Sequence, residues 1–315
     1  MTGSDFSWTP EAGSGIRQRF VTANGVRLEL AEAGDPAGRR LALCLHGFPE
    51  LNYSWRFQMP MLADQGWRVW APNSRGYGAS ERPAAVRAYG LDHLTADVAA
   101  LIDAAAAEGP VDEVMIIAHD WGAIIAWAYA ILHGQGKMPH PLTRLVIMNV
   151  PHPKVMQREL RRWSQLKKSW YVFFFQLPGL PERFMAANDA AGVRRAFYDM
   201  AVDKRRFGPD VLDVYARAAQ APGAMTAMIN YYRALMRYRD AVDLGDAQVK
   251  VPTLMIWGEE DAALGLGCTV GTEQWVPQLA LHRLPRVSHW VQQEAPEQVN
   301  AILAQWLAPQ AADRA

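Results

Sequence analysis

The sequence of 315 residues predicts an α/β protein in which one mostly parallel sheet is flanked by helices. Short apolar runs bounded by turn residues alternate with segments whose apolar residues recur at helical spacing. The runs are continuously apolar, which is typical of strands covered on both faces. Residues 151–246 contain no such run, which predicts a helical insertion into the part of the chain that forms the sheet.

Eight apolar runs predict eight strands. The first two flank Asn24-Gly25, a dipeptide that favours a tight hairpin turn. Residues 91–102 carry apolar side chains at helical spacing, and residues 299–307 form a closing helix by the same criterion. The predicted strands cover residues 16–21, 26–31, 41–45, 67–71, 114–118, 144–148, 253–257 and 280–284.

These elements divide the chain into a core and a cap. Residues 1–150 are predicted to form the first part of the α/β core, residues 151–246 a helical cap, and residues 247–315 the second part of the core. The cap segment shows helical periods, many Arg and Met residues and aromatic clusters, but no convincing strand. We therefore expect the cap to be inserted between the sixth and seventh strands.

The composition is that of an ordinary globular protein, with 50% hydrophobic and 20% charged residues and a formal net charge of zero. This charge gives no reason to expect nucleic acid or an anionic membrane surface as a partner. Residues 1–10 have no signal-peptide pattern, and no apolar run is long enough to predict a membrane span. Only two cysteines occur, Cys44 and Cys268, so we expect no disulfide framework. We therefore expect a cytoplasmic location.

A nucleophile is predicted at Asp120. It follows the fifth strand, with the small residues Ala118 and Gly122 on either side of it. This is the spacing of a nucleophile elbow, a sharp strand-to-helix turn that needs small neighbours. A carboxylate there, in place of the usual Ser, implies attack on a saturated carbon and an ester on the enzyme. The alternative is that Asp120 only caps the following helix.

A loop after the third strand, His46-Gly47-Phe48-Pro49, predicts an oxyanion hole. The glycine lets backbone N–H groups point into a site, so the N–H of Phe48 and that of Trp121 could bind one oxygen. The alternative is a plain strand-to-loop turn, in which His46 organises the loop.

A base and an acid follow Asp120 in chain order. Asp261 trails the seventh strand and His289 trails the eighth, and loops at the carboxyl ends of such strands converge. We expect His289 to be the base and Asp261 to orient it. Taken alone, His289 could equally be a packed or surface histidine.

These residues make the chain resemble the α/β-hydrolase-fold epoxide hydrolases of the soluble type. The resemblance extends from about residue 20 to about residue 307. It rests on the His46-Gly47-Phe48-Pro49 loop, residues 74–80, the Asp120 elbow, residues 149–153 and the acid and base loops. The sequence His119-Asp120-Trp121-Gly122 is the most specific of these, although haloalkane dehalogenases have similar elbows.

The resemblance implies two cap tyrosines that bind the epoxide oxygen, at Tyr171 and Tyr232. Helical geometry supports Tyr232 over its neighbour Tyr231, which points about 100° away from it. Tyr232 shares a helix face with Met225, Met228, Ile229 and Met236. The alternative is that both tyrosines belong only to the core of the cap.

The function implied is conversion of epoxides to vicinal diols. The resemblance implies an ester of Asp120 that is hydrolysed by water activated by His289 and Asp261, with no metal or organic cofactor. The partners are then a lipophilic epoxide and water, with no nucleic acid and no membrane span, and the protein is a monomer or homodimer. The residues expected to line the substrate pocket are aromatic: Phe48, Trp121, Trp170, Phe174, Phe175 and Trp290.

The chain also resembles the fluoroacetate dehalogenases, but the arginines beside the elbow that bind the substrate carboxylate in that family have no counterpart at Trp121 or Ile124. A haloalkane dehalogenase would use the same nucleophile, with Trp121 as one halide donor, but paired tyrosines would then be idle. A serine esterase is disfavoured because no Gly-x-Ser-x-Gly motif occurs. A non-catalytic binding protein on the same scaffold conflicts with an intact set of nucleophile, acid and base.

Overall fold

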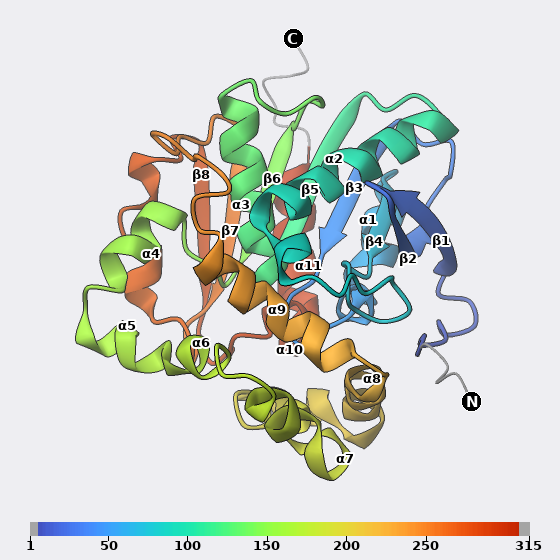
Figure 1. Ribbon diagram of the computed structural model, residues 1–315. Coiled ribbons are helices and arrows are strands. Elements are labelled where there is room, and N and C mark those ends of the chain that lie inside the picture. The colour runs from blue at the N-terminus through green and yellow to red at the C-terminus, as the bar shows by residue number, and fades with distance from the viewer. Residues whose placement is uncertain (1–5, 309–315) are drawn as a thin grey trace.

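The computed structural model describes residues 6–308 and contains an eight-stranded sheet with the order β1-β2-β4-β3-β5-β6-β7-β8 (Figure 1). The pairs β1–β2 and β2–β4 are antiparallel and the other five pairs are parallel. The strands are β1 Arg17–Ala23, β2 Val26–Ala33, β3 Arg40–Leu45, β4 Arg68–Pro72, β5 Glu113–His119, β6 Arg144–Met148, β7 Thr253–Gly258 and β8 Leu279–Leu284.

All eight predicted strands are confirmed, and no end differs from its prediction by more than two residues. The predicted hairpin is also confirmed: Asn24 and Gly25 have φ values of 50° and 71° and connect β1 to β2. Both central residues of the turn are left-handed, which is the backbone that matches the twist of a two-residue hairpin.

Helices cover both faces of the sheet because its strands are apolar on both sides. In β3, Leu43 points into a core shared with α2 and α3, while its neighbour Cys44 points into a second core shared with α1 and α11. The strands thus supply alternate residues to the two cores. The helices outside the cap are α1 Gln58–Asp64, α2 Leu91–Glu108, α3 Trp121–Gly134, α10 Val291–Glu294 and α11 Pro296–Leu307.

The chain between β6 and β7 forms the predicted helical insertion, and residues 151–246 contain no strand. Figure 1 shows α4 at the left beside the sheet and α5 to α9 along the lower side of the molecule. The helix α7 is interrupted at residues 187–190, where the backbone leaves the right-handed region. The domain limits at 150/151 and 246/247 stay predictions. The cap helices are α4 Pro153–Glu159, α5 Trp163–Lys168, α6 Trp170–Phe174, α7 Leu180–Tyr198, α8 Pro209–Gln220 and α9 Ala224–Arg237.

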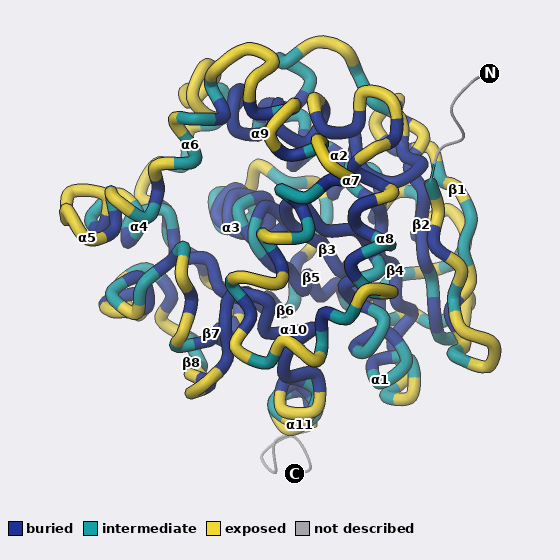
Figure 2. Tube along the Cα trace, turned by 90° about the horizontal axis from the view of Figure 1, so that it is seen from below, coloured by how far each residue is buried: buried dark blue, intermediate teal, exposed yellow. Residues whose placement is uncertain are grey.

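Burial follows this layered arrangement. The strands β3, β5 and β6 are buried at the centre, and exposed residues concentrate on the outer turns of the helices (Figure 2). Cys44 and Cys268 are both buried and free, as small hydrophobic side chains would be. Within residues 6–308, no helix is long and apolar enough to cross a membrane.

We expect Leu43→Ala to lower the free energy of unfolding by about 2–5 kcal/mol, because it opens a cavity at a fully buried position of a central strand. Urea denaturation followed by circular dichroism measures this change. Arg17→Ala, at an exposed position of β1, is the control and should change the free energy by less than about 0.5 kcal/mol. Equal effects of the two substitutions would contradict the assignment of Leu43 to the core.

Candidate active site

Asp120 lies in the sharp turn between β5 and α3. Its φ of 46° and ψ of −119° are unusual for a residue other than glycine. The turn is tight because Gly122 lies against the backbone carbonyls of Leu45 and His46, where a Cβ atom would collide. The alternative role as a helix cap is not observed, because the side chain of Asp120 caps no N–H group of α3.

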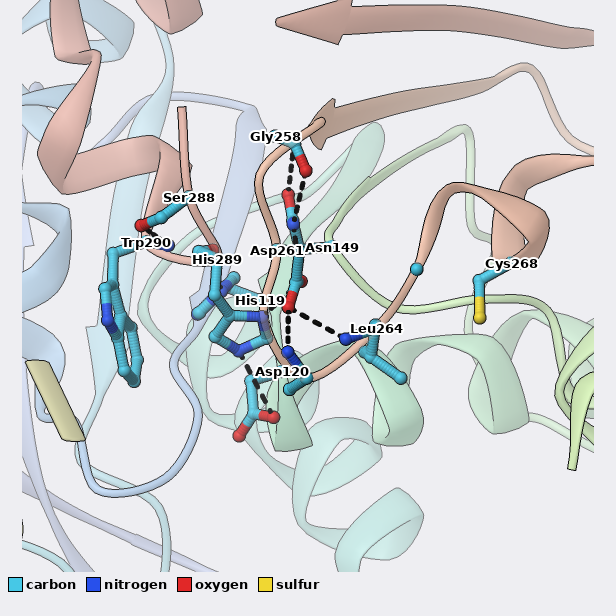
Figure 3. A network of polar contacts seen from close by, with 12 residues as sticks. His119, Asp120, Asn149, Gly258, Asp261, Leu264, Cys268, Ser288, His289 and Trp290 are labelled. Atoms are coloured by element: carbon cyan, nitrogen blue, oxygen red, sulfur yellow. Dashed lines mark hydrogen bonds and ion pairs between the residues drawn. The ribbon is translucent and has the colours of Figure 1, made fainter. Parts of the chain in front are cut away.

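Each oxygen of the Asp120 carboxylate has a different neighbour, and Figure 3 shows the one on the His289 side. The N–H of Phe48 donates a hydrogen bond of 2.7 Å to Oδ1, and Nε2 of His289 lies 3.6 Å from Oδ2. The loop reaches Asp120 because residue 47 is a glycine, since a Cβ atom there would collide with the carboxylate. Among the described residues, the backbone N–H of Trp121 makes no hydrogen bond to Asp120. The role of Trp121 in an oxyanion hole therefore stays a prediction.

His289 is held by Asp261, as Figure 3 shows. The Nδ1 atom of His289 lies 2.7 Å from Oδ2 of Asp261. Asn149 donates to the same oxygen at 2.7 Å, and the N–H groups of Ala263 and Leu264 donate to Oδ1 at 2.7 and 2.8 Å. These bonds fix the carboxylate and therefore the orientation of the imidazole ring.

Asn149 is a site residue whose role the sequence analysis missed. It follows directly after β6 and accepts a hydrogen bond of 2.9 Å from the N–H of Gly258 at the end of β7. A polar residue just beyond a buried parallel strand was the signal that could have identified it. It joins the ends of β6 and β7 at the position of Asp261.

A second buried pair, Glu50 and His119, ties the two sides of the site together. Nδ1 of His119 lies 2.7 Å from Oε2 of Glu50, and its Nε2 lies 2.9 Å from the carbonyl oxygen of His289. Glu50 also accepts the N–H of Gly47 at 2.8 Å, next to the residue that binds Asp120. Neither residue has a role that the sequence predicted. By contrast, His46 organises its loop as suggested, because its Nε2 accepts the N–H of Ser74 at 3.1 Å.

The charges at the site are strongly coupled. Burial alone would raise the pKa values of Asp120 and Asp261, but His289 and hydrogen-bond donors outweigh burial and lower both. Burial alone would lower the pKa of His289, but the carboxylates of Asp261 and Asp120 outweigh burial and raise it to about 10. The resting site therefore holds two carboxylates around one imidazolium.

The two cap tyrosines meet opposite Asp120. Tyr171 on α6 and Tyr232 on α9 have ring centroids 5.9 Å apart, and each lines a cavity together with Asp120. Burial, with a further contribution from the nearby Asp120 charge, raises the pKa of both phenols, so both stay protonated. The neighbouring Tyr231 is engaged elsewhere, because its hydroxyl donates to the carbonyl oxygen of Arg75 at 2.8 Å.

Two cavities of about 290 and 650 Å³ meet at Asp120, Tyr171 and Tyr232. The larger one extends past Trp121 toward α4 and the end of α9, and the smaller one extends toward α7. The aromatic residues expected at the pocket all line one of the two: Phe48, Trp170, Phe174, Phe175 and Trp290 the smaller, and Trp121 the larger. Aliphatic members such as Val172, Met185 and Leu264 carried no signal in the sequence, because only the packing of the cap brings them there.

Comparison with known proteins agrees with this fold. The profile of a family described as alpha/beta hydrolase fold matches residues 43–296. The chain is 35% identical to an AB hydrolase superfamily protein YfhM of Bacillus subtilis, over 93% of this chain and 98% of that one. It is 33% identical to epoxide hydrolase A of Mycobacterium tuberculosis, over 92% of this chain and 97% of that one.

Solved structures give the same result. An epoxide hydrolase of Bacillus megaterium in complex with an inhibitor superposes with a TM-score of 0.82 and 28% identity, covering 92% of this chain and all of that one. Epoxide hydrolase A of Mycobacterium thermoresistibile superposes with a TM-score of 0.78 and 31% identity, covering 93% and 98%. The chain belongs to the epoxide hydrolases of the α/β-hydrolase fold.

We expect Asp120→Asn to lower the pKa of His289 by about one unit or more, because it removes one of the two carboxylates that raise it. The ring titration can be followed by NMR of isotope-labelled histidine, with a midpoint near 10 in the unsubstituted protein. Asp103→Asn, at an exposed aspartate that faces His140, is the matched control and should leave the midpoint unchanged. A midpoint that is the same in all three proteins would refute the coupling of Asp120 to His289.

Proposed function

We propose that the protein hydrolyses lipophilic epoxides to vicinal diols through a covalent ester of Asp120. The observation that carries this proposal is that the phenols of Tyr171 and Tyr232 line the same two cavities as the carboxylate of Asp120. A carboxylate nucleophile and two phenol donors on one cavity suit a substrate whose carbon is attacked while its oxygen needs a proton.

In the first step, Oδ2 of Asp120 attacks a ring carbon of the epoxide and the bond from that carbon to the ring oxygen breaks. Oδ2 is the attacking oxygen, because Oδ1 accepts the N–H of Phe48 at 2.7 Å whereas Nε2 of His289 lies 3.6 Å from Oδ2. Tyr171 or Tyr232 gives a proton to the ring oxygen, since a bare alkoxide is a poor leaving group. The product is a hydroxyalkyl ester of Asp120.

In the second step, His289 first returns its proton to the phenolate left by the first step. It then takes a proton from water as the water oxygen attacks the carbonyl carbon of the ester. The tetrahedral intermediate collapses, the bond from that carbon to the diol oxygen breaks, and the diol oxygen takes the remaining proton of the attacking water, so that the diol leaves and the carboxylate of Asp120 is restored. Formation of the ester removes the charge of Asp120, one of the two charges that keep His289 protonated. The pKa of His289 therefore falls when a base is required, while Asp261 still orients the ring. The N–H of Phe48 stabilises the oxyanion, and we assign Trp121 the second donor.

The two cavities suggest the substrate class. They extend in different directions from Asp120, and both are lined mainly by aromatic and aliphatic side chains. An epoxide with apolar substituents on both ring carbons would place one substituent in each cavity. This mechanism requires no metal or organic cofactor.

We expect His289→Gln to trap the ester. The first step needs only Asp120 and the phenols, whereas the second needs a base. Incubation with styrene oxide should add the mass of the epoxide to the peptide that contains Asp120, as mass spectrometry of a digest would detect. His289→Gln combined with Asp120→Asn is the control and should carry no adduct. A folded His289→Gln protein that binds the epoxide and remains unmodified would refute the covalent mechanism.

We expect Tyr171→Phe combined with Tyr232→Phe to slow formation of the ester by at least about 100-fold, because a general acid contributes a factor of this size. The rate can be measured in single-turnover experiments with stopped-flow fluorescence. Tyr231→Phe is the matched control, because its hydroxyl faces the core rather than the cavity, and it should retain ester formation. Unchanged ester formation in the double variant would refute the role of the two tyrosines.

A haloalkane dehalogenase is the second candidate. Trp121 lines the larger cavity together with Asp120, and its buried indole N–H has no hydrogen-bond acceptor among the described residues, so it is a candidate halide donor. Phe48 presents a phenyl ring where that family often has a second side-chain donor. Halide leaves without a proton, so a dehalogenase should still release chloride from a chloroalkane when both tyrosines are replaced. Such release, together with no diol formation by the unsubstituted protein, would favour this candidate.

A further inference from the structure

The outer face of the cap is both apolar and basic. Within residues 6–308, fifteen large hydrophobic residues are exposed, and seven of them lie between positions 160 and 184. Surface hydrophobic residues that occur singly need no explanation, but such a concentration marks an interaction surface. The seven residues, which we call the cap patch, are Leu160, Trp163, Trp170, Phe173, Leu177, Leu180 and Phe184.

The cap patch is continuous across α6 and α7. Trp170 and Phe184 both contact Phe174, with ring centroids 5.9 and 5.7 Å apart. The members with the largest exposed fractions are the two tryptophans, Trp163 at 68% and Trp170 at 60%. In Figure 1 the helices α5, α6 and α7 that carry most of the patch follow one another along the outer edge of the cap, away from the sheet.

The charge of this region has one sign. Residues 151–184 contain seven Lys and Arg residues and two acidic residues. Both acids are paired with arginines: Glu159 with Arg158 at 2.9 Å and Glu182 with Arg233 at 2.6 Å. Within the described residues Arg161, Lys167 and Arg183 form no ion pair, so their charge faces solvent around the patch.

The net charge of zero conceals this separation. Residues 151–246 contain 16 basic and 10 acidic residues, and the rest of the chain contains 16 basic and 22 acidic residues. The cap is therefore positive and the core negative. A field divided in this way orients the molecule in front of an anionic surface with the cap toward it.

We propose that the cap patch docks on an anionic lipid surface. Tryptophans on an apolar face surrounded by Lys and Arg are the combination that lies in the headgroup region of a bilayer. Leucines at positions 160, 177 and 180 fit acyl chains but offer nothing on which nucleic-acid bases could stack. A second copy of the chain fits poorly, because a two-fold contact would bring two basic faces together.

The docked orientation presents the cavities to the lipid. Trp170 and Phe184 line the smaller cavity, and Leu160 and Phe173 line the larger one. Residues that are exposed and also line a cavity lie at its mouth, so the smaller cavity opens at the cap patch. The larger cavity opens between the patch and the exposed side chains of Leu235 and Met236. If the protein acts on lipophilic epoxides as proposed above, docking in this orientation places the entrance of the site where such an epoxide, dissolved in the bilayer, is most concentrated.

The test is sedimentation of the purified full-length protein with vesicles, which requires no turnover and so can fail independently of the proposed reaction. Vesicles of phosphatidylcholine with about one third phosphatidylglycerol should bind the protein, pure phosphatidylcholine should bind it much less, and added salt should weaken binding. Equal partition into both kinds of vesicle, or none, would overturn the proposal.

Two double variants assign the binding to the patch. Trp163→Ala with Leu180→Ala removes exposed apolar side chains that line neither cavity, and Arg161→Glu with Lys167→Glu reverses two unpaired charges. Each should lower the partition coefficient about tenfold or more. The controls outside the cap are Phe20→Ala and the pair Arg17→Glu with Lys137→Glu, and both should bind as the parent does. Equal losses in the controls would refute the assignment.

Diol formation from a short, water-soluble epoxide separates docking from folding, and it should be unchanged in all these variants. Sedimentation velocity without vesicles tests whether a second copy of the chain binds the cap patch instead. A dimer that the patch variants dissociate, with vesicle binding unchanged, would overturn the proposal in favour of a second copy of the chain.

Discussion

The structure depends on one largely buried charge, the carboxylate of Asp120, held at a turn that strains its backbone. The carboxylate is tolerable there because each oxygen has a partner: the N–H of Phe48 on one side and the ring of His289 on the other. Those partners come from loops after β3 and β8, so the parallel sheet must bring three strand ends together before the charge can be accommodated. The surrounding bonds of Asn149, Glu50 and His119 keep these loops in place.

The same charge couples the two halves of the proposed reaction. An ionised Asp120 helps to keep His289 protonated, and its loss on ester formation releases that constraint. The site thus needs no movement to change the role of the imidazole, because a change of charge at one atom alters the proton affinity of its neighbour. Asp261, held by three donors, keeps the ring oriented throughout.

The cap adds what a carboxylate, an acid and a base lack. Its inner side brings the phenols of Tyr171 and Tyr232 to the point where the two cavities meet. Its outer side gathers apolar and basic side chains around the mouths of those cavities. One helical insertion therefore bears on both the proposed chemistry and the proposed route of the substrate.

Local patterns in the sequence were sufficient for the eight strands, the hairpin at Asn24-Gly25, the elbow at Asp120 and the chain order of Asp261 and His289. Each of these depends on a short run of residues, and the carboxyl ends of parallel strands meet at one edge of a sheet. The resemblance implied Tyr232 rather than Tyr231, helical periodicity supported that choice, and the bond of Tyr231 to Arg75 agrees with it. Only the tertiary structure revealed the hydrogen bonds from Asn149 to Asp261 and between His119 and Glu50. It alone also revealed the shape of the cavities, the charge of His289, and which charged residues surround the cap patch. These depend on distances between residues far apart in the chain, on which periodicity and composition carry no information.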